Sequence, residues 1–284
     1  MQEMFKTTKL TTKRNQHIIA FEGDSITNEI IAKGEYDSNT LAFISDVLTL
    51  IKPNVSLDIG ANIGNHSLVI AGVTKRLLSF EPIPFLYEVL ASNLKLNGLK
   101  HATAINVGLS DTSTNAEIFV DHSGNLGSSS ISERHGAGEL FPISLKHGDD
   151  LLREMGLEES IDFIKIDVEG HEAEVIEGLT SIINSNKPFI LMEWKSDKTI
   201  AGFTHSRILS TMFPDYIIYS LTTNYNKKVH KKGIFGSIER ILNKFLRPSW
   251  CLSSFESNKK YSNICLVPPR HKQLFERFPY LAKQ

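Results

Sequence analysis

The chain has 284 residues, of which 41% are hydrophobic, enough for one large α/β domain with a full core and an appendage. Its formal charge is −1, and no apolar run reaches the roughly 18 residues of a membrane-spanning helix. The two cysteines, Cys251 and Cys265, form no CxxC or Cys–His cluster, so we expect no structural zinc site and two free thiols in a cytoplasmic protein.

Three regions are predicted along the chain: an N-terminal extension (1–39), a main domain (40–222) and a basic C-terminal extension that packs on it (223–284). The first residues lack the apolar core of a signal peptide. Hydrophobic periodicity predicts strands at 55–59, 76–81, 103–110, 161–167 and 188–194, and helices at 40–51, 65–73, 85–98 and 172–183. Because nearly apolar strands alternate with helices, we expect an α/β fold with a mostly parallel, twisted sheet and helices on both faces.

Residues 111–148 interrupt this alternation. Two segments, 115–120 and 138–146, are predicted as paired or flanking strands, with a polar, glycine-rich loop between them at the functional edge of the sheet. Later in the chain, 215–221 is predicted as an antiparallel edge strand.

The C-terminal extension is strongly basic. From Tyr225 onward it carries 13 Lys and Arg against 3 acids, a net charge of +10. An amphipathic helix is expected at 234–246, directly after four lysines: Lys227, Lys228, Lys231 and Lys232. This helix has three interpretations: ordinary core, a cover for an acceptor pocket, or a peripheral contact with an anionic membrane at its inner face. Salt-sensitive binding to an anionic glycan or lipid is therefore predicted.

The segment DIGANIG follows the first predicted strand and contains Asp58, Gly60, Asn62 and Gly64. A glycine-rich turn between a strand and a helix lets backbone approach a ligand. A dinucleotide site would carry glycine where Asn62 stands, whereas S-adenosylmethionine has a cationic end that Asp58 can meet. Glu81, at the end of the next strand, can accept both ribose hydroxyls of either ligand. The structural alternatives are a helix cap for Asp58 and a surface acid for Glu81.

A second constellation lies at the end of the fourth predicted strand. Lys165, Asp167 and Glu169 alternate there and share a face if the chain stays extended. A structural interpretation pairs Lys165 with Asp167, while Glu169 and Glu172 complement a helix N-terminus. The functional interpretation is a carboxylate cluster where an acceptor meets a methyl donor.

A family resemblance lies in six segments, taken in order: DIGANIG, FEP, INVGLSD, GSSS, IKIDVEGHE and ILMEW. On these segments, the chain resembles the FkbM family of S-adenosylmethionine-dependent methyltransferases over residues 36–195. The resemblance implies a Rossmann-like class I methyltransferase fold and O-methylation of hydroxyls on sugars or polyketide-type products. Transferred by residue, cofactor binding is expected at Asp58, Gly60, Asn62, Gly64, Asn65, Glu81, Pro82, Gly108 and Asp167.

The reaction requires a group that removes the proton of the acceptor hydroxyl as the methyl group is transferred. We expect Asp167 to be this base, with Glu169 second and Glu193 and His171 as helpers. His66, after the glycine turn, is expected near the cofactor or as a satisfied helix-end residue. A divalent metal held by Asp167, Glu169, Glu193 and a diol acceptor is an alternative that we do not favour from sequence.

The leading hypothesis is an O-methyltransferase acting on a sugar or surface glycan. A nicotinamide-dependent oxidoreductase is disfavoured by Asn62 and by the lack of a Tyr-x-x-x-Lys pair. A non-catalytic binding module would not need Asp58, Glu81, Asp167 and Glu169 intact. A nucleic-acid substrate is not expected, because no NPPY-like motif follows the fourth strand. The oligomeric state stays open.

Overall fold

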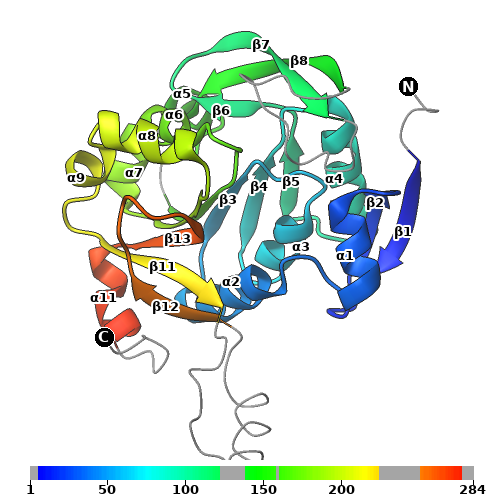
Figure 1. The fold of residues 1–284 in the computed structure, drawn as a ribbon, viewed down its shortest axis with the longest axis horizontal. Coiled ribbons are helices and arrows are strands. Elements are labelled where there is room, and N and C mark those ends of the chain that lie inside the picture. Colours follow the sequence, from blue (N-terminus) through cyan, green and yellow to red (C-terminus); the bar gives the residue numbers. More distant parts are fainter. Residues whose placement is uncertain (1–5, 122–137, 158–159, 224–249, 277–284) are drawn as a thin grey trace, which may run out of the picture.

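The computed structural model describes residues 6–121, 138–157, 160–223 and 250–276. Its centre is an eight-stranded sheet in the order β12-β11-β13-β10-β9-β3-β4-β5 (Figure 1). The strands are β3 (Val55–Ile59), β4 (Arg76–Phe80), β5 (Ala102–Ile105), β9 (Ile161–Ile166), β10 (Phe189–Trp194), β11 (Ile217–Thr223), β12 (Trp250–Ser254) and β13 (Tyr261–Val267). The neighbours from β5 to β10 are parallel, which confirms the mostly parallel sheet predicted from sequence.

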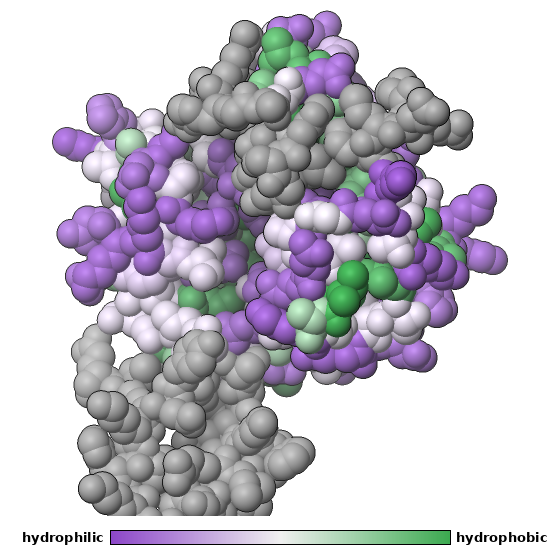
Figure 2. All heavy atoms as spheres, turned by 45° about the vertical axis from the view of Figure 1, so that its right-hand side comes forward, coloured by the Kyte–Doolittle hydropathy of each residue, from purple (hydrophilic) through white to green (hydrophobic). Residues whose placement is uncertain are grey.

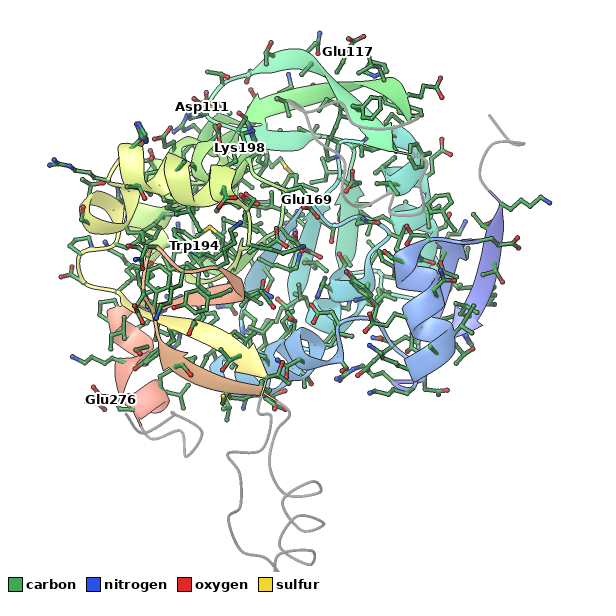
Figure 3. All side chains as sticks on the ribbon, viewed as in Figure 1. Asp111, Glu117, Glu169, Trp194, Lys198 and Glu276 are labelled. Carbon is green, nitrogen blue, oxygen red and sulfur yellow. The ribbon has the colours of Figure 1, made fainter. Side chains whose placement is uncertain are left out.

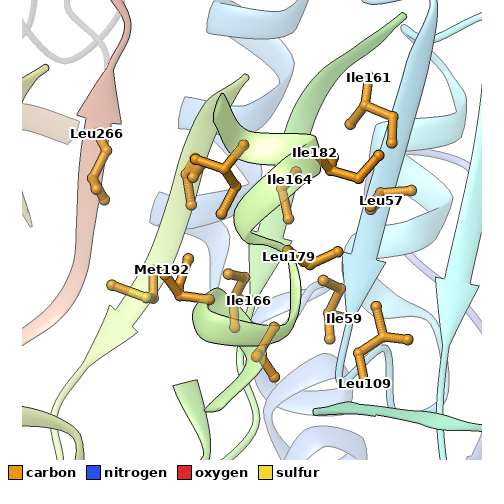
Figure 4. Close-up of a cluster of buried hydrophobic side chains, with 14 of the residues drawn as sticks. Leu57, Ile59, Leu109, Ile161, Ile164, Ile166, Leu179, Ile182, Met192 and Leu266 are labelled. Carbon is orange, nitrogen blue, oxygen red and sulfur yellow. The ribbon is translucent and has the colours of Figure 1, made fainter. Parts of the chain in front are cut away.

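Helices cover both faces of this sheet (Figure 1). On one face lie α5 (Gly148–Glu154), α6 (Glu172–Gly178), α7 (Thr180–Asn186), α8 (Asp197–His205) and α9 (Ile208–Met212). On the other lie α2 (Ser38–Ile51), α3 (Asn65–Ala71) and α11 (Lys272–Glu276), which follows the short helix η1 (Pro269–His271). Strand alternation separates the two cores: Ile164 and Ile166 face the first, shown in Figure 4, and Phe163 faces the second.

Two predicted elements are divided in the structure. The predicted strand 103–110 is two strands, β5 and β6 (Gly108–Ser110), separated where the Asn106 side chain donates to the backbone oxygens of Glu81 and Pro82. The predicted helix 172–183 breaks between α6 and α7. Gly178 at this break packs against Ser110, and a Cβ there would lie 1.9 Å from the Ser110 carbonyl oxygen.

A second, three-stranded sheet has the order β6-β8-β7. β7 (Thr114–Asp121) and β8 (Gly138–His147) are antiparallel, which confirms the predicted pairing of these segments. The polar loop between them, including GSSS at 127–130, lies outside the described residues, as does the predicted helix at 234–246.

The C-terminal region contributes to the central sheet instead of only packing on it. β13 inserts between β10 and β11 and is antiparallel to both. β12 pairs with β11 and forms the edge, so the prediction that 215–221 is an edge strand is wrong. The reason is that 250–254 and 261–267, two short apolar segments after the basic stretch, supply strands that periodicity did not reveal.

The N-terminal region forms a hairpin of β1 (Thr7–Thr11) and β2 (His17–Phe21), followed by α1 (Ser25–Lys33). It packs on α4 (Pro84–Leu96), and the side chain of Asn93 in α4 bonds both the N–H and the carbonyl of Ile19. In the described part of the chain, no helix has the length and apolar content to cross a membrane. The face in Figure 2 shows hydrophilic side chains and side chains of intermediate hydropathy, with small hydrophobic areas between them.

Candidate active site

A cavity opens at the carboxyl ends of β3, β4, β9 and β10, beside the point where the chain order of the sheet reverses. Ligands of doubly wound sheets bind at such a switch point. Figure 3 shows Glu169 near the centre of this region, between the strands and α8, which carries Lys198. The cavity is lined by ten of the predicted site residues: Gly60, Asn62, Asn65, Glu81, Pro82, Gly108, Asp167, Glu169, His171 and Glu193.

The glycine turn is shaped by contacts within the protein. Gly60 has φ +77°, and a Cβ there would lie 1.8 Å from the carbonyl oxygen of Asp167. Gly64 has φ +91° and packs against Leu90, away from the cavity lining. Only glycine fits a left-handed conformation at such close approach. Gly60 therefore allows the ends of β3 and β9 to meet, which brings the two sequence motifs to one cavity.

Glu81 supports the same turn. Its two carboxylate oxygens accept hydrogen bonds from the backbone N–H groups of Asn62, at 2.8 Å, and Ile83, at 2.9 Å. Burial raises the pKa of this carboxyl to about 7, although both hydrogen bonds act to lower it. A carboxylate accepts about four hydrogen bonds, so capacity remains for a ligand in the cavity.

Asp58 lies elsewhere than the sequence interpretation required. Its side chain is fully buried and does not line the cavity. Oδ2 accepts a 2.6 Å hydrogen bond from Ser67, and Oδ1 lies 3.5 Å from Lys165 Nζ. The cation that Asp58 contacts in this structure is therefore the side chain of Lys165, and its contact with a cationic ligand stays a prediction.

The loop after β9 carries the second motif and is held by Glu172. One oxygen of this buried carboxylate accepts from the backbone N–H groups of Val168 and Gly170, and the other accepts from the Thr199 hydroxyl at 2.5 Å. Glu169 adopts φ +50° in this loop, so the strand does not stay extended to that residue. The predicted Lys165–Asp167 pair is present, with 3.3 Å between Nζ and Oδ2.

Three carboxylates meet in the cavity. Oxygens of Asp167, Glu169 and Glu193 all lie within 4.8 Å of one another. Burial, followed by the charge of Asp167, raises the pKa of Glu169 to about 7 and that of Glu193 to about 8. Such a group can bind a cation or exchange a proton near neutral pH.

His171 also lines the cavity, but both ring nitrogens have protein partners. Nε2 lies 3.0 Å from the Ser110 hydroxyl, and Nδ1 lies 3.6 Å from Glu174. Burial lowers the pKa of this imidazole. His66 lines the cavity too, and its Nε2 lies 3.3 Å from Oδ2 of Asp37 at the start of α2, so its position fits both expectations for this residue.

Sequence reasoning did not identify Tyr36 as a site residue. It follows α1, lines the cavity, and accepts a 3.3 Å hydrogen bond from the Asn65 amide at its backbone oxygen. Burial, helped by Asp37 and Asp167, raises the pKa of its phenol to about 12. Ile26, Lys195 and Lys198 also line the cavity. Ile26 and Lys198 come from segments without a motif and reach the cavity through the docking of the N-terminal region and α8, whereas Lys195 directly follows the ILMEW segment at the end of β10.

Comparisons with known proteins place the chain in a family. The family described as the methyltransferase FkbM domain matches residues 58–227, more than half of the chain. Methyltransferase sdnD of Sordaria araneosa is 32% identical over 165 residues, covering 47% of this chain and 63% of that protein. The hexuronic acid methyltransferase AglP of Haloferax volcanii is 29% identical over 153 residues, covering 52% of this chain and 61% of that protein. The chain thus matches less than two thirds of either relative.

Among solved structures, the methyltransferase FkbM of Methylobacillus flagellatus KT aligns with 76% of this chain and 44% of its own, at 17% identity and a TM-score of 0.46. The family match contains the glycine turn, Glu81 and the three clustered carboxylates. On that match, the chain belongs to the FkbM methyltransferase domain family.

Proposed function

We propose that the chain is an S-adenosylmethionine-dependent O-methyltransferase whose acceptor is a hydroxyl of a sugar or glycan. The observation that carries the proposal is the meeting, in one cavity, of the turn held by Glu81 and the carboxylates around Asp167. The first is suited to a nucleoside and the second to a hydroxyl that must lose a proton.

The residues present fit the cofactor. Glu81 has free acceptor capacity toward the cavity for the ribose hydroxyls, and Gly60 and Asn62 offer a backbone edge without bulky side chains. When bound, S-adenosylmethionine supplies an electrophilic methyl group. The protein must then hold the acceptor in line and remove its proton. We assign proton removal to Asp167, which lines the cavity between the turn and the other carboxylates.

The acceptor class is supported by the relative named a hexuronic acid methyltransferase. Two lysines, Lys195 and Lys198, also line the cavity and would suit an acceptor that carries a negative charge. A polyketide-type product is the alternative acceptor, and a nicotinamide-dependent oxidoreductase is the alternative enzyme class. The test below includes both alternatives.

The test uses the full chain and S-adenosylmethionine carrying a labelled methyl group. Acceptors are nucleotide sugars, uronic-acid-containing glycans and polyketide-type alcohols. We expect label on a sugar hydroxyl, in a product that resists mild alkali because an ether, unlike an ester, is not hydrolysed. Thermal stabilisation by NAD but not by S-adenosylmethionine would overturn the proposal. Label found only on polyketide-type alcohols would replace the acceptor class.

The basic segment supports a further proposal on location: a cytoplasmic protein that binds the inner membrane face or an acidic glycan. Its support is the sequence alone, because Lys227, Lys228, Lys231 and Lys232 lie outside the described residues. Co-sedimentation with anionic vesicles and retention on an acidic polysaccharide, at low and high salt, test it. Loss of binding at high salt and in a variant with these four lysines changed to Gln is expected. Equal binding by the variant would overturn it.

A further inference from the structure

The three carboxylates in the cavity come from two neighbouring strand ends. Asp167 and Glu169 follow β9, and Glu193 belongs to β10. Oxygens of all three lie within 4.8 Å of one another. Carboxylates at such separations repel one another strongly unless a cation or a proton lies between them.

The lysines nearby do not satisfy this cluster. Lys165 is shared between Asp167 and the buried Asp58, with Nζ at 3.3 and 3.5 Å from their oxygens. Lys195 reaches only Oε1 of Glu193, at 3.4 Å, from a side chain that is 65% exposed. Glu169 forms no ion pair with another described residue.

Glu193 gives a second, independent observation. Its side chain is 10% exposed, and its buried Oε2 has no hydrogen-bond partner within the described structure. A buried carboxylate oxygen without a partner is costly, because it has lost water and gained nothing in return. The residue lines the cavity, so a ligand there can supply the missing interaction.

We propose that Asp167, Glu169 and Glu193 bind one divalent cation of the oxygen-preferring class, such as Mg²⁺, Mn²⁺ or Ca²⁺. Carboxylate oxygens are the ligands these ions take, at about 2.0–2.6 Å, so two oxygens on one ion lie at most about 4–5 Å apart. The observed 4.8 Å limit is within the range of Ca²⁺ and requires only a small side-chain shift for Mg²⁺.

The role of this cation in the reaction rests on the proposed function, and the cation site makes the proposed acceptor more specific. Three protein ligands leave positions open on the cation, and neighbouring hydroxyls of a sugar can occupy them from the cavity. The cation would then orient the acceptor and ease loss of the hydroxyl proton. An acceptor with two adjacent hydroxyls is therefore favoured over an isolated alcohol.

The test measures Mn²⁺ binding to the full chain by electron paramagnetic resonance, without cofactor or acceptor. We expect one bound Mn²⁺, displaced by Mg²⁺ or Ca²⁺. Glu193→Gln and Glu169→Gln should each weaken binding by at least about tenfold, since even residues behind metal ligands cost about 10- to 100-fold. Glu256→Gln, a change at an exposed acid that pairs with Lys259, should bind as the wild type does.

Folding of each variant is checked by circular dichroism and thermal melting, and cofactor binding is measured separately by calorimetry. Absence of Mn²⁺ binding up to about 1 mM, a binding free energy near −4 kcal/mol, would overturn the cation site. So would equal binding by both folded Gln variants. If methyl transfer also persists in EDTA, the proposed function stands without the cation. Mn²⁺ binding without S-adenosylmethionine binding would support the cation site and overturn the proposed function.

Discussion

Lys165 Nζ lies 3.5 Å from Oδ1 of Asp58, and both side chains are almost completely buried. Burial lowers the pKa of the Lys165 ammonium, but the charges of Asp167 and Asp58 more than offset this and leave that pKa raised. The lysine thus links an acid in the core to an acid in the cavity. Its replacement would leave a buried carboxylate without a cation.

We expect Lys165→Met to lower the free energy of unfolding by about 3–5 kcal/mol, the usual cost of breaking a buried pair on one side. Urea denaturation measures the change. Lys95→Met, at an exposed lysine on α4, is the control and should stay within about 0.5 kcal/mol of wild type. A loss equal to that of the control would show that Asp58 does not depend on this lysine.

The sequence predicted the central-sheet strands from β3 to β10 and the helices α2, α3 and α4 in their chain order, because each of these strands is a short, mostly apolar segment; it did not predict β1, β2, α1 or α5. It also predicted that both motifs reach one edge of the sheet. It did not predict the role of Asp58: a buried acid beside a lysine and one facing a ligand have the same local pattern. β13, inserted between β10 and β11, was missed for a related reason, since strand order depends on pairing across the sheet.

Gly60→Ala should destabilise the protein through close contact between two strand ends. The left-handed φ of +77° costs about 1–2 kcal/mol for alanine, and the new Cβ, 1.8 Å from the Asp167 carbonyl oxygen, forces a backbone shift of about 1–3 kcal/mol more. Gly98→Ala is the matched control, because Gly98 has φ +68° with nothing within 4 Å. Thermal and urea unfolding should therefore show a larger loss of stability for Gly60→Ala than for Gly98→Ala. Equal losses would mean that the strand ends separate readily.

Glu81 should make stability depend on pH. Its pKa is raised from 4.5 to about 7, so between these values the folded protein holds a proton that the unfolded chain has lost. The stabilisation of the folded state by this proton is fully present below about pH 4.5. It is lost as pH rises through about 7, and the free energy of unfolding falls by up to about 3 kcal/mol. Urea midpoints of wild type and Glu81→Gln from pH 5 to 8 measure it.

In the Glu81→Gln variant, an amide NH₂ faces a backbone N–H, which gives a destabilisation that does not vary with pH. The stability difference between the two proteins should therefore shrink as pH rises, because only the wild type loses its proton. A constant difference across this range would contradict the raised pKa.

Asp167→Asn should leave the fold intact and reduce methyl transfer about 10²- to 10⁴-fold, because an amide cannot take the hydroxyl proton. The amide oxygen can still accept from Lys165, which now contacts Asp167 at 3.3 Å. Single-turnover transfer of labelled methyl measures the rate, and calorimetry measures cofactor affinity. Asp215→Asn, at an exposed acid, is the control. A near-normal rate would assign the base elsewhere in the cluster.

Asn93 connects the N-terminal hairpin to the glycine turn. Its Oδ1 accepts from the Ile19 N–H at 2.6 Å, and its Nδ2 donates to the carbonyls of Ile19 and Ile63. Asn93→Leu would leave these three backbone groups unsatisfied in the interior, at about 1–3 kcal/mol each before relaxation. The hairpin should detach more readily than the domain unfolds, because the sheet itself is untouched.

Hydrogen exchange measured by mass spectrometry tests this prediction, with loss of protection expected in 17–21 before the strands of the central sheet. Because Tyr36 follows the hairpin and lines the cavity, cofactor affinity should fall as well. Asn93→Asp keeps the acceptor for Ile19 N–H and should be intermediate, whereas Asn115→Leu, at an exposed asparagine, should leave exchange in 17–21 unchanged. If Asn93→Leu instead lowers protection uniformly across the described chain, the hairpin and the sheet form one cooperative unit, and independent opening of this side of the cavity is excluded.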